Sequence, residues 1–272
     1  MRRDVSTAED LFFIGPGHQK TLLAELAGSK AANLAQMARL ALKVPPAFIL
    51  SAHLCSLVNE RASTVEKALE NMLSEGIAYL ESVTGKSFGD RRRPLFVSVR
   101  SGAARSMPGM MATLLDVGLT HDTVRGLIRL SGNPRLAWDC YRRFVQGYAE
   151  VIGGVEPRPF DEQLQTFTSA EEVTNEAELD PETLERLTSA FLGLAEERLG
   201  SAIPADPMRQ LEAAVRAVYR SWESPKACEY RRLNKLDDLL GTAVTVQAMV
   251  FGNSGAGSGA GVAFSRSFDR RG

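Results

Sequence analysis

Residues 94–119 read PLFVSVRSGAARSMPGMMATLLDVGL, and this stretch decides how the rest of the chain is interpreted. It opens with an apolar run that is typical of a buried strand. Directly after that run, Arg100 and Arg105 lie among serine, glycine and alanine residues, where packing would favour large apolar side chains. A solvated loop would not be expected to carry three methionines. The pattern therefore raises the question of whether an anion binds against this stretch.

The overall charge requires any anion-binding site to be local. The chain has 272 residues, of which 44% are apolar, which is enough for a sizeable core. Its 32 basic and 33 acidic residues give a net charge of −1. No overall field therefore attracts nucleic acid or an anionic membrane, and we expect neither as a partner.

Other features predict a cytoplasmic protein. Cys55, Cys140 and Cys228 are far apart and odd in number, which argues against a zinc site or a disulfide framework and favours reduced thiols. The start of the chain, MRRDVSTAEDLFF, is polar where a signal peptide needs an apolar run. No apolar stretch approaches the roughly 18 residues of a membrane span.

Hydrophobic periodicity predicts a mixture of helices and strands. Helices are expected over residues 28–42, 63–83, 133–154, 178–200, 204–224 and 224–233. Strands are expected after Pro46 and over residues 94–99, 241–252 and 259–266, and the Pro-rich stretch 153–173 is expected to be a long loop. Because residues 110–235 are mostly helical, the fold class is predicted to be α+β, with a sheet interrupted by a helical insertion.

Several common catalytic and nucleotide-binding motifs are absent from the sequence. Neither a GxxxxGK[ST] loop nor a GxGxxG fingerprint after a strand is found. The three histidines, His18, His53 and His121, have no neighbours that suggest catalysis. We interpret them as surface or capping residues.

Basic residues beside small ones are the remaining candidates for binding an anion. Lys30 falls at a predicted helix N-terminus, where free N–H groups already favour an anion, although an exposed lysine without a ligand explains it equally well. Arg100 ends a strand and its guanidinium suits phosphate, with a surface salt bridge as the equal alternative. Gly259 and Gly261 would let a ligand approach the backbone, but their pattern alone favours an ordinary hairpin turn.

Five longer stretches resemble the N-terminal nucleotide-binding domain of the pyruvate, phosphate dikinase family. They occur in the family's order, cover most of residues 10–267, and read AGSKAANLAQMARLALKVPPAFIL, PLFVSVRSGAARSMPGMMATLLDVGL, GNPRLAWDCYRRFVQGYAEVIGG, AVRAVYRSWESPKACEYRRLNKL and GTAVTVQAMVFGNSGAGSGAGVAFSR. The resemblance implies an ATP-grasp fold, in which two subdomains hold ATP between them. It divides the chain into a first subdomain (1–109), a helical insertion (110–200), return helices (201–240) and the start of a second subdomain (241–272).

The resemblance also assigns residues to the phosphates of ATP. Lys30 matches the family's phosphate-binding lysine, and Arg100 matches its phosphate-clamping arginine, so both are candidates for ATP binding and for catalysis. Gly109 matches a glycine close to the phosphates. For Arg105 two interpretations remain open: it lines the nucleotide cleft, or it forms a structural ion pair.

Further residues are assigned to the two ends of the nucleotide. Gln247 and Met249 would line the adenine side. Gly259, Ala260 and Gly261 would cover the phosphates with their backbone N–H groups. In the family, this domain passes the β-phosphoryl group of ATP to a histidine on a separate swivelling domain. The implied cofactors are therefore ATP and Mg²⁺, and the implied partner is a histidine-bearing domain on another chain, with a homo-oligomer left open.

Several positions depart from the family pattern. Ser29 and Ala31 stand where the family commonly has glycine, Ala112 stands where it has aspartate, and Ala260 stands where it has threonine. The sequence ends at Gly272, before the acidic and amide residues that hold Mg²⁺ in the family. We therefore expect that the Mg²⁺ ligands are missing, so that the chain contains no metal site, and that the second subdomain lacks its end.

Two functional interpretations follow from these observations. In the first, the chain is the ATP-binding domain of a dikinase-like phosphotransferase that contributes to phosphoryl transfer together with a partner. In the second, it is a catalytically inactive nucleotide-binding or structural module, or a truncated fragment with an exposed apolar sheet edge at its C-terminus. Neither interpretation expects the chain to complete the reaction alone.

Overall fold

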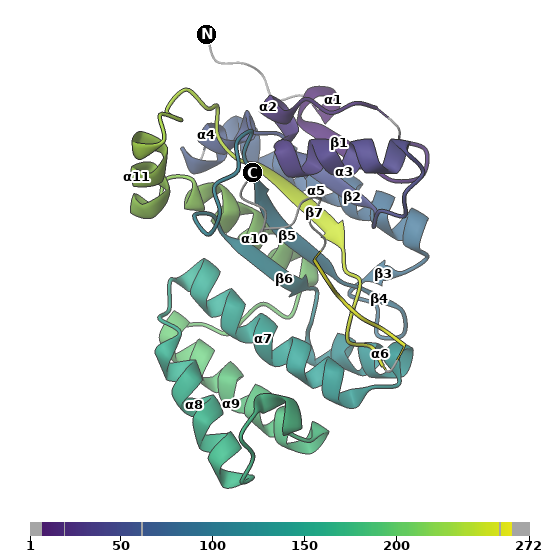
Figure 1. Cartoon of the computed structure of the whole chain (residues 1–272), viewed down its shortest axis with the longest axis vertical. Coiled ribbons are helices and arrows are strands. Elements are labelled where there is room, and N and C mark those ends of the chain that lie inside the picture. The colour runs from purple at the N-terminus through teal and green to yellow at the C-terminus, as the bar shows by residue number, and fades with distance from the viewer. Residues whose placement is uncertain (1–6, 19, 61, 256, 263–272) are drawn as a thin grey trace, which may run out of the picture.

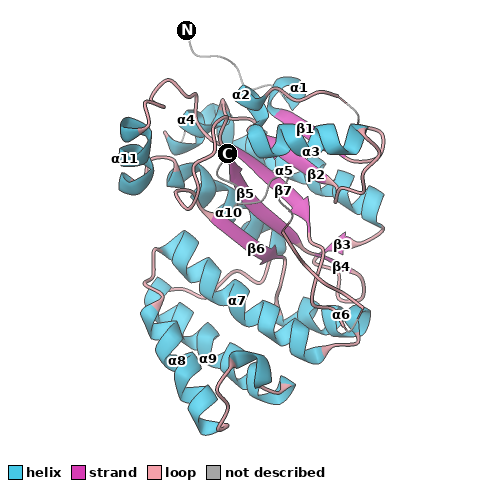
Figure 2. Cartoon of the chain, in the orientation of Figure 1, coloured by secondary structure: helices cyan, strands magenta, loops and turns pink. Residues whose placement is uncertain are grey.

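The centre of the molecule is one five-stranded sheet in which every neighbouring pair is antiparallel (Figure 1, Figure 2). The computed structural model describes residues 7–18, 20–60, 62–255 and 257–262. In spatial order the strands are β1 (Leu11–Ile14), β2 (Ala47–Leu50), β7 (Ala243–Ala248), β5 (Val97–Gly102) and β6 (Thr113–Val117). The mixed helices and sheet agree with the predicted α+β class, whereas the ATP-grasp arrangement remains an expectation from the family.

One face of the sheet is buried beneath helices. Side chains alternate between the two faces of a strand, and the set that includes Phe48, Val99 and Val246 points into the larger of two hydrophobic cores. The helices on this face are α5 (Ser63–Thr84), α7 (Pro134–Gly153) and α10 (Pro207–Ser221). They contact β2, β6 and the central strands respectively, so the whole width of this face is used for packing.

The other face is covered over only part of its width. Helices α2 (Ala24–Ala27) and α3 (Ser29–Arg39) bring small residues, including Ala31 and Ala35, against the half formed by β1, β2 and β7. Over β5 and β6 the same face carries Arg100, Thr113 and Leu115, whose side chains are exposed. A strip of the sheet beside α3 is thus open to solvent.

The junction between α2 and α3 approaches β5 backbone to backbone. Gly28 has φ 81° and ψ 152°, a conformation that is essentially restricted to glycine. A Cβ at this position would lie 2.8 Å from the Cα of Gly102 and closer still to its carbonyl oxygen. Glycine at position 28 therefore sets how closely the start of α3 approaches the end of β5.

Helices α7, α8 (Arg158–Ala170) and α9 (Pro181–Leu199) form a lobe that projects from the sheet (Figure 1). The rings of Phe160 and Phe191 meet edge to face, with 5.0 Å between their centroids. Asn133 and Asp180 cap α7 and α9, because each accepts a hydrogen bond from a backbone N–H of the first helical turn. The lobe is therefore a unit of three helices in which an aromatic contact joins α8 and α9.

The expected long loop over residues 153–173 is wrong, because α8 occupies most of it. Pro157 and Pro159 lie at the start of this helix, where the missing N–H of proline removes no helical hydrogen bond. Phe160, Leu164 and Phe167 recur at helical spacing and contact the core. The prolines and the polar residues masked this periodicity.

The remaining elements complete the covering layers. They are α1 (Thr7–Asp10), α4 (Leu54–Asn59), the short parallel pair β3 (Ser87–Phe88) and β4 (Pro94–Leu95), α6 (His121–Ser131), the 3-10 helix η1 (Glu176–Glu178) and α11 (Pro225–Leu233). Each of the six predicted helices is confirmed, with ends that move by a few residues.

The two C-terminal strand predictions have different outcomes. The strand expected over 241–252 is confirmed in shorter form as β7. Residues 259–262 form no strand, and 263–266 lie outside the described residues. Because β7 is paired on both sides, the edges of the described sheet are β1 and β6, and the expected apolar edge is not found at β7. The sheet also crosses the boundary proposed at residue 240, and the subdomain division stays a prediction.

Replacing Gly28 with alanine is expected to lower the free energy of unfolding by about 3 kcal/mol or more, because a collision with Gly102 adds to backbone strain. Gly17→Ala is the matched control. Gly17 has φ 80°, and a Cβ there would meet nothing within 4 Å. This control should cost only about 1 kcal/mol. Urea unfolding followed by circular dichroism measures both losses, and equal losses would contradict the role of the close approach.

Candidate functional site

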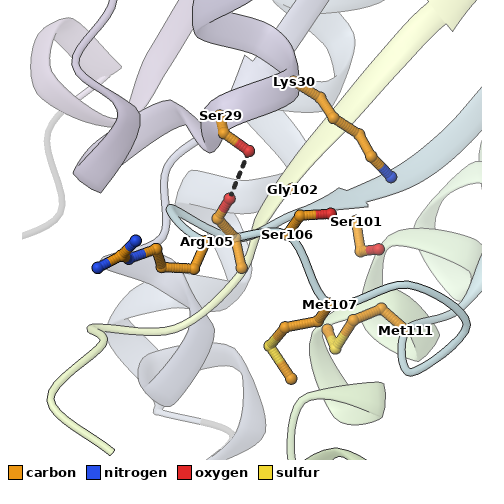
Figure 3. A pocket seen from close by; sticks show the side chains of 9 residues that line it. Ser29, Lys30, Ser101, Gly102, Arg105, Ser106, Met107 and Met111 are labelled. Carbon is orange, nitrogen blue, oxygen red and sulfur yellow. Dashed lines mark hydrogen bonds between the residues drawn. The ribbon is translucent and has the colours of Figure 1, made fainter. Parts of the chain in front are cut away.

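A small pocket opens where α3, β5 and the following loop meet (Figure 3). Ser29 and Lys30 line it from α3, Ser101 and Gly102 line it from the end of β5, and the loop over residues 103–111 closes it. The pocket holds about 20 Å³, which is room for about one water molecule. It is a polar notch at the edge of the open sheet strip and not a cavity that encloses a ligand.

Two hydrogen bonds attach this loop to α3. The backbone N–H of Ser29 donates to the carbonyl oxygen of Ala103 at 3.0 Å, and its hydroxyl donates to the same oxygen at 3.2 Å (Figure 3). Met107 is buried in the larger core and holds the middle of the loop. Gly109 then turns the chain with φ 68° at an exposed position. The start of α3 and the loop thus form one fixed unit.

Three exposed cations surround this unit. The side chain of Lys30 extends over β5, whereas the guanidinium of Arg105 points in the opposite direction (Figure 3). Within the described residues, no ion pair or side-chain hydrogen bond involves Lys30, Arg100 or Arg105. The structural ion pair left open for Arg105 and the salt bridge left open for Arg100 are therefore not found in this part of the chain.

Arg100 lies near the same end of β5 as Lys30, which reaches it from α3. It precedes Ser101 on β5 and lies in register with Thr113 and Thr245 on the neighbouring strands. Its side chain belongs to the open strip of the face that α3 partly covers. The structure thus brings the two predicted phosphate-binding cations to one end of β5, although Arg100 does not line the small pocket itself.

Gln247 and Met249 lie toward the other end of β5. Gln247 is in register with Ser98, and its side-chain amide donates to the carbonyl oxygen of Pro45 at 3.0 Å. The backbone N–H of Met249 donates to the carbonyl oxygen of Phe96 at 2.9 Å. Since a strand rises about 3.3 Å per residue, roughly 10 Å separates this end from Ser101. The predicted adenine side and the predicted phosphate side are thus the two ends of one strand.

The glycine-rich turn lies near the segment that follows β7. Gly259, Ala260 and Gly261 are exposed, and none of them lines the pocket beside Lys30. A Cβ on Gly252 would lie 2.9 Å from the Cβ of Ala260, so the turn packs against residue 252. Its role over the phosphates stays a prediction.

A second cavity of about 360 Å³, open to solvent, lies at the Met249 end of β5. It is lined by Asp116 from β6, by a group of α7 residues that includes Cys140, and by residues 249–253. Burial raises the pKa of Asp116 to about 7, against the lowering effect of a hydrogen bond from Cys140. The same burial raises the pKa of the Cys140 thiol, so the thiol stays protonated.

Two polar residues at this sheet were not singled out from the sequence. The hydroxyl of Thr245 is buried with no hydrogen-bond partner among the described residues. Thr245 and Gln247 alternate with Val244 and Val246, and this alternation is a detectable signal of a polar sheet face. Asp116 was detectable as the one acidic residue in the apolar run TLLDVGL.

Neither a metal centre nor a membrane span is found in the part of the chain that the structure describes. No group of three or more His, Cys, Asp or Glu residues there could hold a metal ion. No described helix combines the length and the apolar character needed to cross a bilayer. Mg²⁺ and the cytoplasmic location stay expectations from the sequence.

The family model described as pyruvate phosphate dikinase, AMP/ATP-binding domain, matches residues 58–271. Similar curated relatives include pyruvate, phosphate dikinase 2 of Zea mays, which is 42% identical over 262 residues, covering 96% of this chain and 30% of the relative. The pyruvate, phosphate dikinase of Clostridium symbiosum is 41% identical over 242 residues, covering 89% and 28%. That of Rhizobium meliloti (strain 1021) is 43% identical over 239 residues, covering 88% and 27%. The chain spans less than a third of the length of these relatives.

Thr245→Val is expected to raise the free energy of unfolding by about 1 kcal/mol, because valine keeps the shape and removes a buried hydroxyl that has no partner. Thr242→Val is the matched control. The Thr242 hydroxyl accepts from the N–H of Gly102 at 3.1 Å and donates to the carbonyl oxygen of Ala243 at 2.9 Å. Its loss should therefore cost about 1–3 kcal/mol. Thermal unfolding measures both, and changes of the same sign would contradict this assignment of hydrogen bonds.

Proposed function

The chain belongs to the pyruvate phosphate dikinase AMP/ATP-binding domain family, and from this premise we propose that it binds ATP along β5. The phosphates would lie at the end shared by Lys30 and Arg100, and the base would lie at the end marked by Met249. The observation that carries the proposal is that Lys30 and Arg100 are exposed over one strand end with no acidic partner in the described residues.

The proposed phosphate site combines several features that favour a polyanion. Two cations that are not neutralised by a protein carboxylate are available for charge-assisted hydrogen bonds. Arg100 offers a planar fork that matches phosphate oxygens, while Lys30 supplies a compact charge at the start of α3. Gly102 and Ala103 have little or no side chain, so a phosphate can come close to the backbone.

The open half of the sheet face supports an extended nucleotide. Ser98, Arg100, Thr245 and Gln247 share this face by register, so it is polar along the length of β5, with Arg100 exposed and the other three side chains buried. Helices α2 and α3 pack mainly over the neighbouring strands β1, β2 and β7, and α3 also contacts β5. A nucleoside triphosphate at this face would have its phosphates at Lys30 and Arg100 and its base toward Met249.

We also infer a role in phosphoryl transfer to a histidine on another domain or chain. The relatives are named as dikinases and are more than three times longer than the matched region, so the histidine acceptor would lie outside the region described here. Lys30 and Arg100 would stabilise the negative charge that spreads over the transferring phosphoryl group. No carboxylate lines the pocket beside Lys30, so the described residues do not fit a Mg²⁺ site there.

A second candidate function is that of an inactive nucleotide-binding or structural module. The specific observation in its favour is the narrow pocket, in which the Ser29 hydroxyl is already engaged by Ala103. A phosphate would have to lie outside the pocket, against Arg100 and the open strip. The titration below separates ATP binding from a purely structural module, because a structural module has no need of Arg100. An inactive nucleotide-binding module would still bind ATP, and an assay of phosphoryl transfer to a histidine-bearing domain separates it from the first candidate.

Lys30→Ala and Arg100→Ala are each expected to weaken ATP binding about tenfold or more, because each removes a charge-assisted contact to phosphate. Lys67→Ala is the matched control. Lys67 is exposed on α5, which lies on the opposite face of the sheet, so its loss should change the affinity less than about twofold. Calorimetric titration with ATP, with and without Mg²⁺, measures all four proteins. Equal affinity in the wild type and both site variants would remove Lys30 and Arg100 from the site.

A further inference from the structure

Three consecutive arginines, Arg91, Arg92 and Arg93, occupy the turn between β3 and β4, and all three are exposed. Asp90 holds the turn, because its Oδ1 atom accepts from the backbone N–H of Arg92 at 2.7 Å and from that of Arg93 at 2.6 Å. The N–H of Ser87 also donates to the carbonyl oxygen of Arg93 at 2.9 Å. The backbone that presents the three guanidinium groups is therefore fixed by hydrogen bonds.

Helix α6 packs directly against this turn (Figure 1). A Cβ on Gly126 would lie 2.7 Å from the carbonyl oxygen of Arg91, so the absence of a side chain permits the close approach. The guanidinium of Arg91 also donates to Asp122 at 2.7 Å. Arg125 and Arg129 are exposed, and each lies three residues beyond one of these two contact positions on the same side of α6. We call this surface the arginine patch and define it as Arg91, Arg92, Arg93, Arg125 and Arg129.

The arginine patch carries an excess of positive charge in a chain whose net charge is −1. Asp90 and Asp122 are the two acidic residues of the turn and of α6, so three of the five positive charges are not balanced there. Within the described residues, ion pairs involve none of the patch arginines except Arg91. Four guanidinium groups thus remain available for a partner.

The charges on the neighbouring elements cancel one another. Glu81 on α5 accepts from the backbone N–H of Phe88 at 2.7 Å, and Lys86 follows it closely in the chain. Asp206 caps α10, which begins beside the turn, and its Oδ2 atom lies 3.9 Å from Nε of Arg209. These elements therefore leave the excess charge of the arginine patch in place.

We propose that the arginine patch docks an acidic segment of a partner protein. Guanidinium groups make two parallel hydrogen bonds to a carboxylate, and arginine is enriched at protein interfaces. Leu130, one turn beyond Gly126 on α6, is 49% exposed and offers an apolar contact beside the cations. An apolar side chain of a protein can pack on Leu130, whereas the phosphate backbone of a nucleic acid cannot. The surface therefore fits a segment that combines carboxylates with apolar residues.

The arginine patch lies outside the proposed ATP site. Strand β4 leads into the start of β5, whereas Lys30 and Arg100 lie toward the other end of that strand. The inference therefore stands or falls independently of ATP binding.

The test is fluorescence anisotropy with a labelled peptide that repeats Glu-Glu-Leu. Arg92→Glu combined with Arg93→Glu is expected to weaken binding about tenfold or more, because it removes two charge-assisted contacts and adds repulsion. Arg125→Glu combined with Arg129→Glu should weaken it similarly, and this pair decides the question if the first does not fold. The affinity of the wild type should also fall as salt is raised.

Lys67→Glu combined with Arg198→Glu is the matched control, since it changes the net charge by the same amount. Lys67 is near the start of α5, whereas the turn follows the end of that helix. Arg198 precedes Leu199, which contacts the far end of α7 from α6. This control should change the affinity less than about twofold.

Leu130→Ser distinguishes a protein segment from any other polyanion. It should weaken the Glu-Glu-Leu peptide severalfold and leave the affinity for a Glu-Glu-Ser peptide unchanged, a difference that charge alone does not produce. Tighter binding of duplex DNA or of phosphatidylglycerol vesicles through the same arginines would overturn a protein partner. The docking site itself is overturned if the Glu-Glu-Leu peptide does not bind, or if both arginine double variants bind it as tightly as the wild type.

Discussion

The close approach of Gly28 to Gly102 is the constraint on which the candidate site depends. It brings the first turn of α3 against the end of β5, so that Ser29 can bond twice to the carbonyl oxygen of Ala103. Those bonds fix the loop that carries Gly109 and place Lys30 above the strand that carries Arg100. Any side chain at position 28 would separate the helix from the strand and move the two cations relative to each other.

The unequal covering of the sheet explains why a polar strip exists at all. One face is buried across its full width beneath α5, α7 and α10, and this core supplies most of the apolar burial. The other face needs only α2 and α3, whose alanines allow a close fit over β1, β2 and β7. The fold therefore does not need helices packed over β5 and β6 on this face for its stability. The exposed side chains of Arg100, Thr113 and Leu115 are left available for a ligand.

Local sequence signals predicted the helices well, because caps such as Asn133 and Asp180 act within one turn. The predicted phosphate-binding roles of Lys30 and Arg100 came from the family resemblance, since spacing alone supported an exposed surface role for each of them equally well. Helix α8 was missed because proline is common both at the start of a helix and in a loop. The carboxylate of Asp116 was missed because its burial depends on α7 and on residues 249–253, which are distant in sequence.

The central place of β7 has a consequence for how the chain reaches this fold. Strands β1 and β2 form one antiparallel pair and β5 and β6 form another, and among the described strands β7 alone joins the two pairs. During synthesis, β2 and β5 each have backbone N–H and C=O groups without a strand partner until residue 248 has left the ribosome and β7 can pair with both. The joining contacts link residues about 150 to 200 positions apart, a separation that slows folding. Completion of the sheet is thus a late event, and the proposed ATP site forms in the same step.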